Sequence, residues 1–138
     1  MANLYAVQTL MDGPRNVVVK VTGVLDTSDL ASTTVIDPAT LSAIGAFGTL
    51  PTKVRIDMIE YNIEDTLSVN LFWDATTPVL TGEFTGRGTQ KYRQFGGLLN
   101  NAGAGITGKI TATTTTTGTA ISATNILSFT LYITLVKQ

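Results

Sequence analysis

The segment Arg87–Phe95 combines cationic and aromatic side chains that could bind a partner. It holds three of the nine basic residues, Arg87, Lys91 and Arg93, interleaved with Tyr92 and a phenylalanine. Such mixtures are typical of nucleic-acid binding, because cations neutralise phosphates and aromatic faces stack on bases. Three cations are too few against a formal net charge of −1. We therefore expect no nucleic-acid partner and interpret the segment as a protein-docking edge, or equally as a solvated strand face whose aromatics turn inward.

The acidic residues form no recognisable catalytic or metal-binding pattern. A glycosidase needs two carboxylates across a cleft, and Glu60, Glu64, Asp65 and Glu83 qualify by residue type only. The loop Asp26–Leu30 lacks the spacing, the glycine and the terminal glutamate of a calcium loop, so it favours an Asx turn. The glycine-rich stretches have no helix or Lys-Ser sequel and are not nucleotide motifs.

The composition removes most of the remaining catalytic chemistry. Without His or Cys, the chain has no Ser-His-Asp or Cys-His nucleophile, no disulfide and no imidazole or thiolate metal site. We therefore expect a protein that is not an enzyme and that takes no cofactor, metal or small-molecule substrate. A pI near 5.2, the absence of a long apolar run and the lack of a basic leader predict no membrane partner and no signal peptide.

The low charge indicates hidden surface. Only 14% of the residues are charged, against about 25% in typical domains. The 25 threonines supply hydroxyls on strand faces, and permanent association with another protein would cover the rest. A threonine-rich monomer of low solubility is the simpler alternative.

Strands must position these residues, because apolar side chains recur with period two along nearly the whole chain. The clearest runs are 67–73, which carries Trp73 in its inward phase, and 127–135. Residues 16–22 and 52–64 also alternate, and weaker runs lie near residues 4–10, 32–36, 79–85, 90–95 and 106–117. Within 52–64 the apolar phase changes after Met58, which predicts a β-bulge near Met58-Ile59 or a strand that passes between sheets.

The connections predict few other elements. Asp37 followed by Pro38 predicts at most one short helix near residues 38–44. The tract Thr113–Thr117 should continue a strand with both faces wet. Residues 96–105 have no period and are expected to form a long functional loop. Together these patterns predict one all-β antiparallel domain over residues 1–138, with eight or nine strands and residues 1–10 as an extended arm or edge strand.

Several segments resemble small virion proteins of tailed bacteriophages, in particular capsid cement or decoration proteins. The resemblance rests on Asn16–Asp26, Val69–Pro78, Gly96–Gly105 and the closing Phe129–Gln138. It implies a jelly-roll-like β-sandwich that self-associates as a dimer or trimer, lies on the outer surface of the capsid and braces neighbouring major capsid subunits. It also implies a protein made in the host cytoplasm, and it supplies no catalytic residues.

We expect the protein contacts of such a molecule in three regions, residues 1–10, 87–95 and 96–105. The candidate interface residues are Leu4, Tyr5, Arg87, Lys91, Tyr92, Arg93, Leu98, Leu99, Asn100 and Asn101. The alternative function is a glycan- or receptor-binding module on a phage tail or fibre. That alternative predicts exposed aromatics beside a carboxylate or amide, whereas the cement function predicts a buried Trp73 and an apolar oligomer interface.

Overall fold

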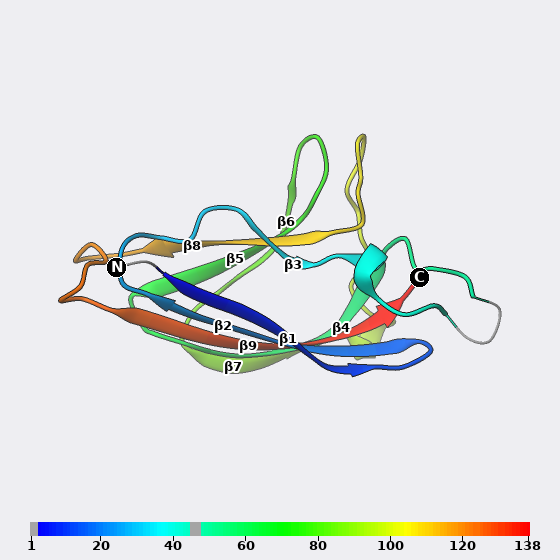
Figure 1. The fold of residues 1–138 in the computed structure, drawn as a ribbon, viewed down its shortest axis with the longest axis horizontal. Helices are drawn as coiled ribbons and strands as arrows, with labels where there is room; N and C mark the ends of the chain where they lie inside the picture. Colours follow the sequence, from blue (N-terminus) through cyan, green and yellow to red (C-terminus); the bar gives the residue numbers. More distant parts are fainter. Residues whose placement is uncertain (1–2, 45–47) are drawn as a thin grey trace.

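The computed structural model describes residues 3–44 and 48–138, which form two antiparallel β-sheets (Figure 1). The strands are β1 Leu4–Asp12, β2 Asn16–Leu25, β3 Thr33–Ile36, β4 Val54–Ile63, β5 Leu67–Trp73, β6 Val79–Phe84, β7 Arg87–Lys91, β8 Ile110–Thr116 and β9 Leu127–Lys137. Two single-turn 3₁₀ helices, η1 Pro38–Thr40 and η3 Arg93–Phe95, lie between strands. Within these residues no α-helix is present, and the predicted antiparallel sandwich of eight or nine strands is confirmed.

The strand pairing is that of a jelly roll. One sheet has the order β1-β2-β9-β4-β7, and the other has the order β3-β8-β5-β6. Four antiparallel pairs, β5 with β6, β4 with β7, β3 with β8 and β2 with β9, form one long ribbon that runs out and back. Successive pairs of this ribbon lie in different sheets, which is the jelly-roll wrapping. Strand β1 adds a fifth strand beside β2.

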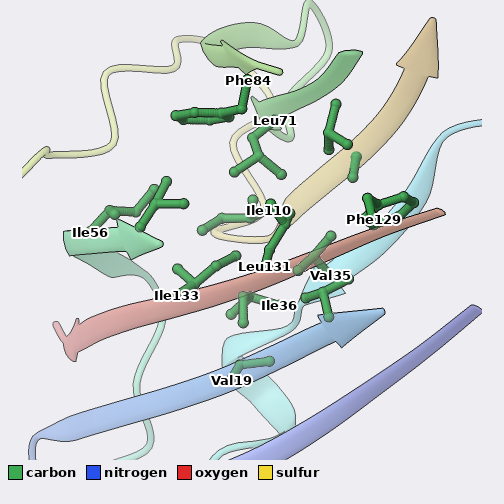
Figure 2. Packing of buried hydrophobic residues seen from close by; sticks show 14 of the residues in the cluster. Val19, Val35, Ile36, Ile56, Leu71, Phe84, Ile110, Phe129, Leu131 and Ile133 are labelled. Atoms are coloured by element: carbon green, nitrogen blue, oxygen red, sulfur yellow. The ribbon is translucent and has the colours of Figure 1, made fainter. Parts of the chain in front are cut away.

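The core fills the space between the two sheets (Figure 2). Strand β9 is central in its sheet, and its alternate apolar residues are all buried: Leu127, Phe129, Leu131, Ile133 and Leu135. Trp73 at the end of β5 is 1% exposed, as its phase predicted. Gly23 lies opposite Phe129, and a Cβ there would come within 2.4 Å of the Phe129 ring. A glycine at this position therefore lets the ring lie flat against β2.

The predicted change of phase in the fourth strand is a β-bulge, placed slightly earlier than predicted. The register of β4 with β9 shifts between Ile56 and Met58, so Asp57 is the extra residue. Ile56 and Ile59 are buried on either side of it, whereas Met58 is only half-buried. Met58 therefore does not continue the inward phase of Ile56, because the chain has already changed phase at Asp57.

Two further boundaries differ from the sequence predictions. The strand predicted at 90–95 is β7 at Arg87–Lys91, and η3 follows it, because Gly96 at φ 84° lets the chain reverse. The helix predicted near residues 38–44 is only the single turn η1. The Asp37 side chain accepts a hydrogen bond from the Ala39 N–H at its start, and Leu41 is already extended.

The threonine tract does form the end of β8, but its two faces differ. Thr114 is 6% exposed on the core side, so the prediction that both faces are wet is wrong. The Thr114 hydroxyl donates to Asp29 at 3.1 Å and accepts from the Leu30 N–H at 2.7 Å. Asp29 also accepts from the Thr116 hydroxyl at 2.6 Å. The Asp26–Leu30 loop is thus fastened to β8 by threonine hydroxyls.

Candidate interaction surfaces

The predicted interface residues fall on opposite edges of the five-stranded sheet. Leu4 and Tyr5 belong to β1 at one edge, and Arg87 and Lys91 belong to β7 at the other. Residues 98–101 belong with β7, because Leu98 exchanges backbone hydrogen bonds with Ile56 of β4 (Ile56 N to Leu98 O, 3.0 Å; Leu98 N to Ile56 O, 2.7 Å). The structure therefore divides the ten residues into two groups separated by the width of a sheet.

The first group lies on the edge formed by Leu4–Met11, here named the β1 edge. This segment carries no charged side chain, and every residue in it except Tyr5 is exposed. Leu4 is 69% exposed, Leu10 48% and Met11 46%. Strand β3 is only four residues long and cannot cover a nine-residue strand. Both faces of β1, as well as its free backbone edge, are therefore open to solvent.

Tyr5 is the exception on the β1 edge. Its ring packs against the core, and its hydroxyl donates to the Thr34 carbonyl at 3.2 Å. Burial raises the pKa of this hydroxyl to about 12. Tyr5 thus ties β1 to β3 across the open side of the sandwich, and Leu4 is the member of this predicted pair that faces solvent.

The second group lies on the β7 edge, defined here as Arg87–Lys91 together with Arg93. Arg87, Lys91 and Arg93 are all exposed. Arg93 lies 3.8 Å from the carboxylate of Asp57, the bulge residue, which also holds the Arg55 guanidinium at 3.2 Å. The backbone carbonyl of Asp57 accepts from the Tyr92 N–H at 2.8 Å. The bulge therefore anchors the turn that follows β7 and leaves the basic side chains outside.

Tyr92 and the neighbouring Phe95 are the aromatic residues of this edge. Tyr92 is half-buried against the core, and burial, followed by the nearby Tyr61, raises the pKa of its hydroxyl. Phe95 meets the Tyr92 ring edge-to-face at 5.9 Å and is 66% exposed. An inward aromatic side chain therefore describes Tyr92, whereas Phe95 is exposed to solvent.

The loop that follows is fastened rather than free. Leu98 packs against the core, and Leu99 beside it is 56% exposed. Asn100 accepts a hydrogen bond from the Ala102 N–H at 3.0 Å, and Asn101 is exposed. Of the four predicted residues in this loop, Leu98 to Asn101, a partner can therefore reach Leu99 and Asn101 most easily.

The same loop joins the β5–β6 connection to form a projection. The Thr76 N–H donates to Ala104 O at 3.2 Å, and the Thr107 hydroxyl donates to the Asp74 carboxylate at 2.7 Å. Gly105 lies so close to Thr76 that a Cβ would meet the Thr76 hydroxyl. Figure 1 shows both segments rising together from the four-stranded sheet.

An ion pair between a buried lysine and a partly exposed aspartate, which the sequence did not predict, lies at the far end of the β1 edge. The Lys137 side chain is fully buried, and its ammonium forms an ion pair with Asp12. It also donates to Gly13 O at 2.7 Å and to the Ser42 carbonyl at 2.8 Å. The signal was present in the sequence, because Lys137 continues the inward phase of the last strand after Leu135.

Asp12 is held from both sides in this cluster. The Ser42 N–H donates to its carboxylate at 2.9 Å and the Ser42 hydroxyl at 2.8 Å. Burial raises the pKa of Asp12, but the hydrogen bonds from Lys137 and Ser42 and the Lys137 charge outweigh burial and lower it overall. The cluster locks the β1–β2 hairpin to the end of β9 and to the loop after η1.

The carboxylates considered for catalysis are dispersed. Glu60 lies on the outer face of the five-stranded sheet, and Glu83 lies on the outer face of the other sheet, so these two cannot face each other. Glu64 and Asp65, in the β4–β5 turn, line a polar hollow of about 320 Å³ with Arg87. In residues 3–44 and 48–138, no three carboxylates gather as a metal site.

Comparison with known proteins adds no relative. Neither protein-family models nor curated protein sequences match the chain. Among the described residues, no helix is long and apolar enough to cross a membrane.

Proposed function

We propose that the protein is a non-enzymatic virion structural protein that binds the outer surface of a phage capsid and braces neighbouring major capsid subunits. The observation that carries this proposal is the placement of two chemically different contact edges on opposite sides of one rigid sheet. A brace must hold two partners at once, and a sheet closed into a jelly roll keeps its two edges at a fixed separation. The resemblance of the sequence to capsid decoration proteins supports the choice of the shell as the surface to be braced.

Bracing of this kind needs no chemistry beyond association. A protein that binds the assembled shell and not free subunits stabilises the shell by mass action. Contacts that are weak individually gain avidity when many copies sit on a fixed lattice. The low charge of the chain suits this role, because capsid subunits would cover part of its surface on the shell.

The β7 edge is the part of the molecule best suited to the shell. Its cations, Arg87, Lys91 and Arg93, are exposed, and the turn and loop that continue this edge expose the apolar side chains of Phe95 and Leu99. Arginine pairs bidentately with carboxylates, and aromatic residues supply contact area at the centre of interfaces. We infer that this edge meets an acidic surface of the capsid protein with apolar side chains at its centre.

The test compares phage particles assembled with and without this chain. The expected result is that particles lacking it release their genome at lower temperature, measured with a dye that fluoresces on exposed DNA. Purified protein added back should restore the original temperature. Equal release temperatures, or no binding of added protein to the shells, would refute the proposal.

A second candidate function, glycan recognition, is favoured by one feature. Phe72 lines an open, apolar hollow of about 200 Å³ on the outer face of the four-stranded sheet, with the hydroxyl-bearing Ser32, Thr111 and Thr113 around it. A sugar ring could stack on Phe72 and hydrogen-bond to the hydroxyl of Ser32, which is exposed. Binding on a glycan array that Phe72→Ala abolishes would support this candidate, and no bound glycan at millimolar concentration would remove it.

A further inference from the structure

The four edges of the two sheets differ in how well they are protected against pairing with another strand. Natural proteins protect edges with short strands, charged side chains or irregular backbone. Strand β3 has four residues, β6 carries Glu83 and a register shift, and β7 carries Arg87 and Lys91. The β1 edge, Leu4–Met11, has no charge and belongs to a nine-residue strand whose register shift lies near its end, at Leu10, so the strand is regular from Leu4 to Thr9. Of the four, it alone combines length with an uncharged, apolar surface.

The β1 edge is also held in place for pairing. Its residues are in register with β2 from Leu4 opposite Val24 to Asp12 opposite Val17, with one shift after Thr9. The end of the strand is locked by the ion pair of Asp12 with buried Lys137. A partner would therefore add to a fixed template and would not have to order a loose arm.

The chemistry of this edge points to what covers it. Free N–H and C=O groups along an edge are satisfied by an extended backbone, so the occupant is a strand. An uncharged edge attracts neither an acidic nor a basic strand, and two copies of it meet without like charges. When two copies run antiparallel about Val7, the regular part of β1 before its register shift pairs with itself, with Ala6 opposite Gln8 and Tyr5 opposite Thr9.

We propose that β1 pairs antiparallel with β1 of a second copy, about a two-fold axis perpendicular to the sheet near Val7. The two five-stranded sheets then join into one continuous sheet, with a β7 edge at each end. This inference deepens the proposed function and rests on its claim that the protein braces neighbouring capsid subunits. In such a dimer each basic β7 edge contacts a different capsid subunit, and the paired β1 strands connect them.

The first test is the oligomeric state of the full chain by sedimentation velocity at micromolar concentration. We expect a dimer for the natural chain. Val7→Lys places two ammonium groups at the axis and should weaken dimerisation at least tenfold, whereas the matched control Thr89→Lys in β7 should leave it unchanged. Because Val7→Lys could disturb the fold, Ala6→Lys, at an exposed position opposite Thr22, is the second variant, and the melting temperature of each variant is measured.

The second test uses the absence of cysteine from the chain. Directly opposed residues of an antiparallel pair have Cα atoms about 4.5–5.5 Å apart, within reach of a disulfide. Val7→Cys should therefore oxidise to a cross-linked dimer much faster than the control Thr89→Cys.

A monomeric natural chain, a Val7→Lys or Ala6→Lys variant that stays dimeric, or equal cross-linking of both cysteine variants would overturn the inference. These outcomes are separate from shell binding. A monomer that still binds shells refutes the β1 pairing alone, and a dimer that does not bind shells refutes the proposed function alone.

Discussion

The two edges of the five-stranded sheet are built on opposite principles. The β1 edge exposes apolar side chains and open backbone, and Asp12 at its end forms an ion pair with the buried Lys137. The β7 edge exposes Arg87, Lys91 and Arg93, and its bulge carboxylate, Asp57, lies beneath arginines that reach solvent. The difference indicates that one protein can present a neutral surface for strand pairing and a charged surface for a different partner on the same sheet.

The largest expected change in the free energy of unfolding comes from removing Asp12, the carboxylate at the end of the β1 edge, and it should exceed the change from removing Asp57 beside the β7 edge. Asp12→Ala leaves the fully buried Lys137 ammonium without its counter-ion, which should lower the free energy of unfolding by about 3–5 kcal/mol. Asp57→Ala should cost clearly less, since Arg55 and Arg93 are partly exposed and can be solvated. Urea unfolding of the two variants measures the contrast, and equal losses would contradict it.

The ion pair between Asp12 and Lys137 should also make the stability of the protein depend on pH, with a smaller effect. The pKa of Asp12 is lowered in the folded state, so its contribution to stability is present above the unfolded value of about 3.9. That contribution is lost as the pH falls through the lower, folded pKa, because the unfolded chain then binds more protons. The stability gap between the natural chain and Asp12→Asn should therefore narrow below about pH 4. A gap that stays constant down to pH 2 in urea unfolding would exclude this role.

Reversing a charge on the β7 edge should weaken binding to capsid shells and leave the stability of the fold unchanged. Arg87→Glu should weaken attachment to capsid shells about tenfold at low salt, equivalent to about 1.4 kcal/mol. The effect should diminish at high salt through screening. Lys20→Glu, on the outer face of the same sheet but away from β7, is the matched control and should bind normally. Equal weakening by both variants in a co-sedimentation assay would mean that β7 is not the contact.

The smallest expected effect is the difference in stability between removing the hydroxyl of Tyr5 and removing the hydroxyl of Tyr92. Tyr5→Phe removes the hydroxyl that donates to Thr34 O and should cost about 1 kcal/mol. In the described residues, no hydrogen bond joins the Tyr92 hydroxyl to the protein, so Tyr92→Phe should change stability by less than about 0.5 kcal/mol. Thermal unfolding below pH 9 measures both, and a larger loss for Tyr92→Phe would reverse the assignment.

Periodicity predicted the parts of the fold in which one face is buried and the other is not. β5 and β9 are central strands with one face on the core, so each buries a continuous series of alternate apolar residues, and both were placed by that alternation. The long loop at 96–105 was found because it lacks any period. The sequence also predicted the edge strand at the start of the chain. Residues 1 and 2 of that predicted segment lie outside the described residues.

Features that depend on contacts between distant residues were missed or misplaced. The bulge at Asp57 is hidden because Met58 and Ile59 are both apolar, so the change of phase could be placed at either. Thr114 is buried by the loop that Asp29 fastens over it, which no local pattern records. The ion pair between Asp12 and Lys137 joins the two ends of the chain, and only the inward phase of Lys137 hinted at it.

The most direct test of the central claim is a cryo-electron microscopy reconstruction of the phage particle with this protein in place. The account predicts density on the outer surface in which copies pair through β1 and each β7 edge lies against a different capsid subunit. Density in which β1 contacts the shell while β7 faces solvent, or an outer surface without this protein, would contradict the account.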